Sequence, residues 1–350
     1  MTVRAYAVER AGGPVQVHTY DAAPLGPLDV LVAVTHCGVC RTDVGMVDDE
    51  WGISAYPVVA GHEAIGVVEA LGDGVDRGRL TVGQRVGVGA TAGSCFACEW
   101  CLSGRQQLCP AKDNTAVRGD GGAFASHVRA TDWRHVYPIP DAIASEHAGP
   151  LLCAGTTVFA PLVRQGIRPT DRVAVVGIGG LGHLAIQFLA AWGCHVTAVS
   201  STPDKEADAR RFGAHAFVAT GGATGVPTGV PTGGGTGLAA VANSFDHILS
   251  TVSADLPWDA YLATLRPHGT LCVLGVFDGT MTLSPLSLVP GERRIVGGVT
   301  APPAQTRQML DFAARHGIRP TVETFPAARL DEALEHVRRG RARYRAVVEF

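Results

Sequence analysis

The stretch RVAVVGIGGLGHLAIQFLAAWG, residues 172–193, predicts the fold of the middle of the chain. A short apolar run leads directly into Gly177, Gly179 and Gly182, which are spaced Gly-x-Gly-x-x-Gly. Apolar residues then recur at three- and four-residue steps up to Gly193, which is typical of an amphipathic helix that ends at a glycine. A strand, a glycine turn and a helix in this order suit a pyrophosphate, because the turn lets the backbone approach it and the helix N-terminus favours negative charge. The stretch therefore predicts a dinucleotide-binding unit, against the alternative of a glycine-rich turn in another kind of sheet.

The sequence that follows this stretch continues to alternate between strand and helix. Strand patterns at 195–201, 245–252 and 269–277, with a helical pattern at 204–213, are typical of a parallel sheet covered by helices. The middle of the chain is thus expected to form a doubly wound α/β domain.

The two ends of the chain have a different texture. Residues 1 to about 150 contain short strand-like runs such as VLVAVTH and AIGVVEALG, broken by Gly and Pro, and predict an irregular β-barrel or sandwich. After residue 300, two helical patterns lead into the strand-like YRAVVEF at 344–350.

The composition limits the classes of function. The chain of 350 residues is long enough for two domains, and 46% hydrophobic and 17% charged residues are typical of a compact globular protein. The formal net charge is −3 with Lys and Arg scattered, so no basic stripe is offered to nucleic acid. The N-terminal segment lacks the apolar core of a signal peptide, and no apolar run reaches the roughly 18 residues of a membrane span. We therefore expect a cytoplasmic protein with no nucleic-acid or membrane partner.

Four of the nine cysteines lie in one loop, CFACEWCLSGRQQLC, with the spacing Cys-x2-Cys-x2-Cys-x7-Cys. They are Cys95, Cys98, Cys101 and Cys109. Such a loop can wrap four thiolates around one zinc ion at about 2.3 Å, and four protein ligands leave no position for water or substrate. The loop predicts a structural zinc site, with an iron–sulfur cluster or a chance cluster as the alternatives.

The turn that follows the predicted strand at 195–201 indicates which cofactor the protein binds. An acidic residue there would bond the ribose 2′-hydroxyl of NAD, but this strand ends in Ser200 and Ser201, and Thr202 and Lys205 follow. Hydroxyl donors and an ammonium group suit a 2′-phosphate, so the turn predicts NADP(H). Asp204 argues for NAD, but it follows a proline and is expected to point to solvent.

A dispersed set of residues could hold a second metal ion. Cys40 in GVCRTD, His62 with Glu63 in AGHEAIG, and Cys153 in LLCAGTTV are the ligand types that catalytic zinc uses when one position stays open. Spacing alone does not show that they converge. Taken singly, each is better explained without a metal: Cys40 as half of a redox pair, His62 as a core histidine and Cys153 as a small buried thiol.

Together these motifs resemble the zinc-dependent medium-chain alcohol dehydrogenase family, and most closely its cinnamyl alcohol dehydrogenase-like branch of NADP-dependent aldehyde reductases. The resemblance is carried nearly end to end by GVCRTD, YPVVAGHEAIGVV, the four-cysteine loop, PLLCAGTTVF, GIGGLGHLAIQ and YRAVVEF. It implies an α/β fold with a mostly-β, GroES-like catalytic domain (1–152 and 291–350) and a Rossmann doubly wound parallel sheet domain (153–290). It also implies hydride transfer between NADP(H) and an alcohol or aldehyde at a catalytic zinc, and a homodimer.

The resemblance assigns the metal ligands residue by residue. Cys40, His62 and Cys153 correspond to the ligands of the catalytic zinc, and Glu63 to a neighbouring carboxylate that can ligate when substrate is absent. Cys37 is not among them. The four cysteines of the loop correspond to the ligands of the structural zinc, which agrees with their spacing and implies two zinc ions per chain.

The resemblance also assigns proton and cofactor contacts. Thr42 corresponds to the hydroxyl that passes a proton from the zinc-bound alcohol, and Asp43 to a carboxylate that orients His62. The implied cofactor contacts are Arg41, Thr157, Gly177, Gly179, Gly180, Leu181, Gly182, Ser200, Ser201 and Lys205.

The sequence departs from the family pattern at two points. Gly45 stands where many members carry the histidine that ends the proton relay, and the segment 112–122, which helps to wall the substrate pocket in this branch, is short. Glycine carries no proton, so either water reaches Thr42 directly or the chemistry is not alcohol interconversion. Trp51 and Trp100 are candidate pocket aromatics, although core packing is the commoner role of tryptophan.

Two other functions stay open at this stage. The same fold and cofactor could reduce an activated C=C or C=N bond in a specialised metabolite, and a zinc-organised binding or regulatory module would not be an enzyme. The Gly/Thr/Pro-rich run at 220–237 is expected to be a mobile surface insertion without a chemical role.

Overall fold

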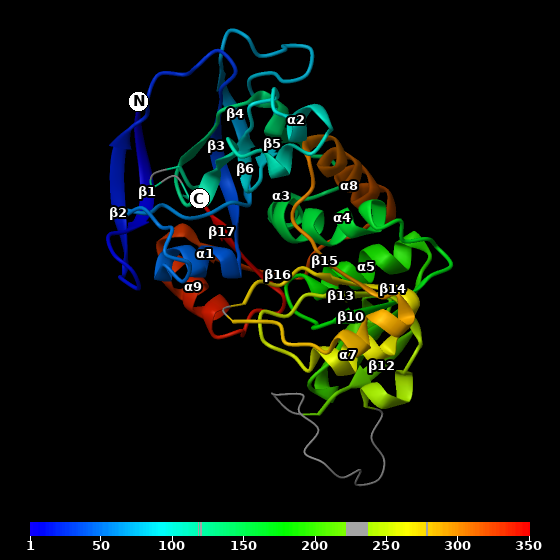
Figure 1. Cartoon of the computed structure of the whole chain (residues 1–350). Coiled ribbons are helices and arrows are strands. Elements are labelled where there is room, and N and C mark those ends of the chain that lie inside the picture. The colour runs from blue at the N-terminus through cyan, green and yellow to red at the C-terminus, as the bar shows by residue number, and fades with distance from the viewer. Residues whose placement is uncertain (118, 120, 222–236, 278) are drawn as a thin grey trace. The chain divides into compact units, whose positions relative to one another are not determined.

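The computed structural model describes residues 1–117, 119, 121–221, 237–277 and 279–350 (Figure 1). Most of the predicted insertion at 220–237 therefore lies outside the described residues. By its internal contacts the chain divides into two compact units, which we call unit 1 (Met1–Thr156 and Thr300–Phe350) and unit 2 (Thr157–Val299). The boundaries predicted from the motifs, after residues 152 and 290, place Cys153 in the middle domain, whereas the division by contacts places it in unit 1 with Cys40 and His62.

Unit 2 is built on a six-stranded sheet in which all paired strands are parallel. Its strands are β10 (Arg172–Val176), β11 (His195–Ser200), β12 (Ala216–Ala219), β13 (Phe245–Ser250), β14 (Leu265–Val273) and β15 (Arg294–Gly297). They lie in the order β12-β11-β10-β13-β14-β15, which is the 3-2-1-4-5-6 order of a Rossmann domain. The strand order reverses between β10 and β13, which is where such sheets bind dinucleotides.

Helices cover both faces of this sheet. They are α5 (Gly182–Trp192), α6 (Glu206–Arg211) and α7 (Trp258–Thr264), and in Figure 1 α5 and α7 lie on opposite faces. A further helix, α4 (Thr156–Arg164), packs on α5 through Phe159 and Phe188, whose ring centres are 5.5 Å apart. The predicted periodicity of α5 is confirmed, because its apolar residues from Leu184 to Leu189 are buried and it ends at Gly193 with φ 104°. An L-residue rarely adopts that backbone conformation, so glycine ends the helix at no steric cost.

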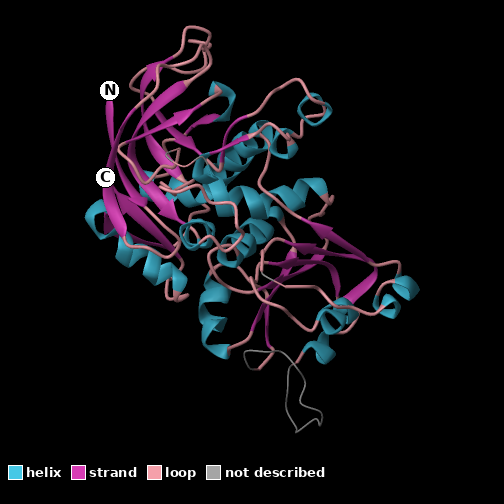
Figure 2. Ribbon diagram, turned by 60° about the vertical axis from the view of Figure 1, so that its left-hand side comes forward, coloured by secondary structure: helices cyan, strands magenta, loops and turns pink. Residues whose placement is uncertain are grey.

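Unit 1 is mostly β-structure (Figure 2). Its strands are β1 (Thr2–Val8), β2 (Val15–Asp21), β3 (Val30–Val39), β4 (Ala64–Leu71), β5 (Arg85–Val88), β6 (Thr91–Gly93), β7 (Asp113–Asn114), β8 (His127–Ala130), β9 (Val136–Pro138), β16 (Val322–Pro326) and β17 (Arg345–Glu349). Strand β3 is the centre of the main sheet, since β4, β8 and β17 all pair with it antiparallel. The last strand of the chain thus lies beside one of the first, with Val347 opposite Gly38.

Five α-helices complete the described part of unit 1. They are α1 (Arg41–Asp48), α2 (Glu99–Leu102), α3 (Ser145–Pro150), α8 (Pro303–His316) and α9 (Leu330–Arg338). A one-turn π-helix, Leu151–Gly155, connects α3 to α4. The predicted fold class, α/β with a Rossmann doubly wound parallel sheet and a mostly-β GroES-like part, is confirmed.

Each unit has its own hydrophobic core. In unit 1 the core lies between the sheet and the segments packed on it, with Val32, Val86 and Ala346 fully buried. In unit 2 Ile248, Leu262 and Leu271 are fully buried between the sheet and α7. Burial of such apolar surface contributes roughly 25 cal/mol per Å² and fixes the strands that carry the candidate site residues.

Candidate functional site

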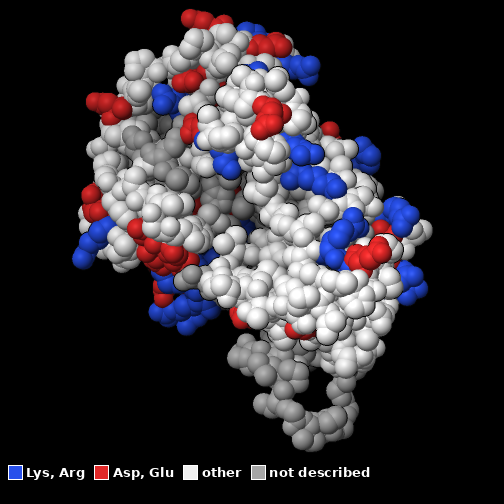
Figure 3. Space-filling view, viewed as in Figure 1, with Lys and Arg blue, Asp and Glu red and all other residues white. Residues whose placement is uncertain are grey.

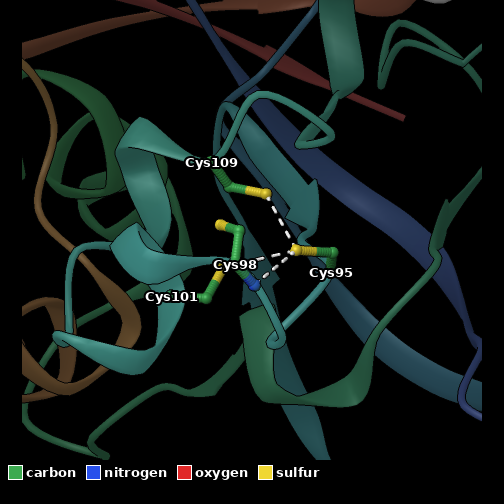
Figure 4. A group of neighbouring side chains, drawn as sticks. All are labelled: Cys95, Cys98, Cys101 and Cys109. Carbon is green, nitrogen blue, oxygen red and sulfur yellow. Dashed lines mark hydrogen bonds between the residues drawn. The ribbon is translucent and has the colours of Figure 1, made fainter.

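Four cysteine side chains converge in the loop between β6 and β7 (Figure 4). The sulfur atoms of Cys95 and Cys101 are 3.9 Å apart, those of Cys95 and Cys109 are 3.5 Å apart, and all four lie within 4.8 Å of one another. Zinc–sulfur bonds of about 2.3 Å give a tetrahedron with edges of about 3.8 Å. The structure thus brings together the predicted set Cys95, Cys98, Cys101 and Cys109 with the spacing that one zinc ion requires.

The backbone of this loop lowers the pKa of one of the four cysteines. Hydrogen bonds from the backbone N–H groups of Ala97 and Cys98 lower the pKa of Cys95 to about 6. Burial instead raises the pKa of the Cys101 thiol to about 12. A metal ion would therefore meet an ionised sulfur at Cys95 and displace a proton from Cys101.

A second cluster forms from three distant segments of unit 1. Cys40 precedes α1, His62 and Glu63 precede β4, and Cys153 lies in the π-helical turn. The sulfur atoms of Cys40 and Cys153 are 3.9 Å apart, and His62 Nε2 lies 3.2 Å from the Cys153 sulfur. Two sulfurs and one imidazole nitrogen at these separations are a ligand set for zinc with a fourth position left over.

Asp43 forms hydrogen bonds that fix the positions of Cys40 and His62. Its carboxylate is completely buried and accepts hydrogen bonds from His62 Nδ1 (2.8 Å), Gly61 N (2.9 Å) and Cys40 N (2.8 Å). The bond to Nδ1 leaves Nε2 of His62 facing the two sulfurs. Because Asp43 lies in the first turn of α1, where negative charge is favourable, the helix and the ligand geometry support each other.

The pKa values in the cluster move in opposite directions. The hydrogen bond with Cys153 lowers the pKa of Cys40 well below its ordinary value and raises that of Cys153. Burial alone would lower the pKa of His62, but the charge and hydrogen bond of Asp43 outweigh it and raise that pKa well above its ordinary value. Because zinc binds thiolates and neutral imidazole, a zinc ion that binds there displaces the protons that these groups carry.

Arg345 is a site residue that the sequence did not reveal. Its buried guanidinium, on β17, pairs with Glu63 Oε1, which is also buried. Glu63 Oε1 lies 4.0 Å from His62 Nε2, so the carboxylate is beside the ligand cluster but is bound to the arginine. Gly38 leaves room for Glu63 Oε2, since a Cβ atom at residue 38 would overlap that oxygen. The sequence feature that could have indicated this role is a charged residue at the start of the apolar strand pattern YRAVVEF.

Thr42 and Arg41 lie at the exposed start of α1. Thr42 Oγ1 is 3.8 Å from the Cys40 sulfur, so its hydroxyl is next to the ligand cluster and open to solvent. Arg41, the predicted cofactor contact, donates a hydrogen bond to Glu50 at 2.6 Å.

The structure gives a physical reason for Gly45. A Cβ atom at residue 45 would lie 2.5 Å from Cη2 and 2.8 Å from Cζ3 of Trp51, because the loop after α1 folds back and packs the indole on the helix. Trp51 thus occupies the space that a side chain at residue 45 needs. Of the two predicted aromatics, Trp51 belongs to this helix face, whereas Trp100 lies in α2 between two cysteines of the loop.

We expect Gly45→His to destabilise the protein by about 1–3 kcal/mol, because the imidazole must expel the indole of Trp51. The same substitution in a Trp51→Ala background is expected to cost much less, since the space is then free. Denaturant unfolding of the four proteins gives the coupling energy, and equal costs in both backgrounds would disprove the steric explanation.

The glycine-rich loop of unit 2 has the geometry that its spacing predicts. Gly177 has φ 87°, and a Cβ atom on Gly182 would overlap the Gly177 carbonyl oxygen, so this glycine allows the close approach of strand and helix. A Cβ atom on Gly179 would meet no atom within 4 Å. Gly180 and Leu181 follow directly before α5. The loop therefore exposes its backbone at the middle glycine, where a pyrophosphate would approach.

The predicted phosphate-binding turn lies beside this loop. Ser200 ends β11, and the exposed Ser201 follows it. The ammonium group of Lys205 donates a hydrogen bond to the carbonyl of Ile178, within the glycine-rich loop, at 3.0 Å. Thr157, the remaining predicted cofactor contact, is buried in the first turn of α4.

Two observations concern the predicted absence of nucleic-acid and membrane partners. On the face shown in Figure 3, acidic and basic side chains are mixed in small groups among a larger area of other residues. Among the described residues, no helix is both long and apolar enough to cross a membrane.

Comparisons with known proteins agree on one family. Residues 26–141 match the alcohol dehydrogenase GroES-like domain, and residues 180–315 match the zinc-binding dehydrogenase domain. The chain is 41% identical to aldehyde reductase AdhA of a Synechocystis species over 99% of this chain and 98% of that protein. It is 38% identical to a probable cinnamyl alcohol dehydrogenase of Oryza sativa over 92% of this chain and 88% of that protein.

Solved structures give the same result. A cinnamyl alcohol dehydrogenase of Sorghum bicolor superimposes with a TM-score of 0.90 at 33% identity, covering 100% of this chain and 98% of that chain. A structure from Helicobacter pylori, described as a CAD complexed with NADP(H), has a TM-score of 0.88 at 26% identity, with 100% and 98% of the chains covered.

Proposed function

Because the chain belongs to the zinc-dependent medium-chain alcohol dehydrogenase family, in its cinnamyl alcohol dehydrogenase-like branch, we propose that it interconverts aldehydes and alcohols with NADP(H). The observation that carries this proposal is the convergence of Cys40, His62 and Cys153 around one point, with Glu63 turned to Arg345. Three protein ligands leave one position for the oxygen of a substrate.

The proposed site residues divide the work as follows. Cys40, His62 and Cys153 would hold a catalytic zinc, which when bound supplies a Lewis acid for the carbonyl while NADPH supplies hydride. Asp43 keeps Nε2 of His62 directed at the metal position. Thr42 is placed to exchange a proton between the substrate oxygen and solvent, because its hydroxyl lies beside Cys40 and is exposed.

The proposal includes a second zinc ion with no catalytic role. Cys95, Cys98, Cys101 and Cys109 would hold it, and four sulfur ligands would close its coordination sphere. Metal analysis of the purified protein is expected to give two zinc ions per chain, and Cys101→Ser is expected to remove one of them.

The proposed activity is tested by product identification. Purified protein with NADPH and an α,β-unsaturated aldehyde is expected to form the unsaturated alcohol, and Cys40→Ser is expected to abolish the reaction. Saturated aldehyde formed without alcohol would overturn the proposal.

One observation keeps a second candidate function in view. Gly45 carries no proton, and Trp51 fills the space beside it, which would suit a reductase that needs no proton relay at zinc. That reductase would act on an activated C=C or C=N bond, and iminium compounds in the same product assay would reveal it.

The cofactor preference is expected to change when the phosphate-binding turn is altered. Ser201→Asp with Lys205→Ala replaces a hydroxyl and a cation by a carboxylate, which repels a 2′-phosphate and bonds a 2′-hydroxyl. The ratio of kcat/KM for NADPH to that for NADH should fall by about a hundredfold, if each exchanged contact contributes about 1.4 kcal/mol. An unchanged ratio would show that the phosphate is bound elsewhere.

We extend the proposal to a cytoplasmic homodimer. Strand β14 is paired on both sides, and the two edges of the described six-stranded sheet are β12 and β15. In the segment between β14 and β15, Val276, Leu286 and Val289 are at least 66% exposed, and a second copy could cover these apolar side chains. A reducing compartment would keep the cysteine ligands available for zinc. Sedimentation of the wild-type chain is expected to give a dimer and that of Leu286→Lys a monomer.

A further inference from the structure

A groove of about 730 Å³ lies in unit 1 and has no cysteine among its lining residues. It is bounded by the turn at 76–80, the segment 133–138 and the first half of α8. Its size is within the roughly 300–1,000 Å³ of small-molecule sites. Nothing in the proposed chemistry uses it.

Two guanidinium groups face this groove without a counter-ion. Arg307, on α8, is partly buried, donates one hydrogen bond to the carbonyl of Arg134 at 2.8 Å, and lies 5.4 Å from the ring centre of Tyr137. Arg79 faces it from the turn. Among the described residues, no carboxylate oxygen lies within 4.0 Å of either guanidinium. Burial, and then repulsion from Arg79, lower the pKa of Arg307, although Tyr137 opposes this.

Three further charged residues line the groove: Arg134, Asp76 and Asp311. Arg134 is the third arginine that lines it, but Asp132 already pairs with its guanidinium. Asp76 and Asp311 line the groove as well, and Asp76 Oδ1 accepts a hydrogen bond from the Gly78 backbone at 2.9 Å. Two carboxylates at the rim disfavour a ligand with two or more negative charges.

The floor of the groove is apolar. Leu80 and Leu310 are 2% and 1% exposed, Val136 is also buried, and the indole of Trp133 forms part of the wall. A planar or branched apolar group could rest on these side chains while a guanidinium binds a single negative charge.

We propose that this groove binds a small monocarboxylate with an apolar body, whose carboxylate pairs with Arg307 and Arg79. An unpaired guanidinium that is partly withdrawn from water is costly, and a carboxylate offsets that cost with two parallel hydrogen bonds. The site is separate from the catalytic cluster, and the proposal stands whether or not the proposed activity is confirmed.

The test is titration of the zinc-loaded protein with benzoate in a calorimeter. Wild type is expected to bind benzoate saturably, Arg307→Gln and Arg79→Gln to bind it about tenfold or more weakly, and Asp311→Asn to bind it more tightly. Arg315→Gln is the matched control, because Arg315 is an exposed residue of the same helix outside the groove; its affinity should stay within about twofold of wild type.

The result that would overturn the proposal is equal affinity in wild type and both arginine variants, or no saturable binding at all. Benzoate bound at the catalytic zinc instead would compete with the aldehyde and act equally on wild type and Arg307→Gln. Arg79→Gln changes an exposed side chain, so a loss of binding there would not come from misfolding.

Discussion

Replacing Arg345 by methionine is expected to destabilise the protein by about 3–5 kcal/mol, because it leaves the buried Glu63 carboxylate without its counter-ion. The pair is fully enclosed: Arg345 is 4% and Glu63 0% exposed. Burial raises the pKa of Glu63, although the charge of Arg345 lowers it. Urea unfolding of the zinc-loaded protein measures the loss.

Two controls separate charge from packing in this experiment. Arg343→Met alters an exposed arginine two residues earlier and should change stability by less than about 0.5 kcal/mol. Arg345→Met combined with Glu63→Gln removes both charges and should recover much of the loss. If the double variant is as unstable as the single one, the arginine acts through packing alone.

The same variant has a pH dependence whose sign follows from Glu63. Without Arg345 the pKa of Glu63 in the folded state rises further above its unfolded value of about 4.3. The folded state then binds more protons than the unfolded state in the interval between the two values, so stability falls as pH rises through it. The deficit of Arg345→Met against wild type should be small near pH 4 and grow toward neutral pH, and a constant deficit would contradict this account.

Asp43→Asn is expected to weaken zinc binding at the catalytic cluster by about 10- to 100-fold. The carboxylate accepts three hydrogen bonds, and an amide replaces one of its oxygens by a donor that must face another donor. Dialysis against a chelator followed by metal analysis should leave one zinc ion per chain, held by the four-cysteine loop.

The matched control for this substitution lies on the same helix. Asp48, at the other end of α1, pairs with Arg338 near the surface, so Asp48→Asn should cost about 1 kcal/mol or less and leave the zinc content unchanged. If Asp43→Asn kept two zinc ions and full kcat/KM, the carboxylate would not be needed to orient His62.

Local patterns predicted the parts of the structure that local chemistry determines. The glycine spacing at 177–182 and the helical period after it are sufficient for α5 and its turn, because strand, turn and helix are consecutive. The four cysteines within one loop are likewise close in sequence, so their convergence needs no knowledge of the rest of the fold.

The convergence of Cys40, His62 and Cys153 could not be predicted in that way. Cys40 and Cys153 are 113 residues apart, and only the pairing of β3 with β4 and the position of the π-helical turn bring them together. The resemblance to a family supplied this set, whereas the residues alone did not. Arg345 contacts Glu63 because of the register of β17 on β3, and Trp51 contacts Gly45 because the loop after α1 folds back. Neither contact produces a periodic pattern in the sequence, so neither could be predicted from it.

The pairing of β17 with β3 has a consequence for the order in which the protein is made. Unit 2 is continuous in sequence and can fold once its last strand has left the ribosome, whereas unit 1 waits for a strand synthesised after all of unit 2. Until β17 arrives, β3 has an open edge and Glu63 has no arginine. A nascent chain would therefore carry a folded unit 2 while unit 1 is still incomplete, and the last strand would complete both the sheet of unit 1 and the pair of Glu63 with Arg345 in one step.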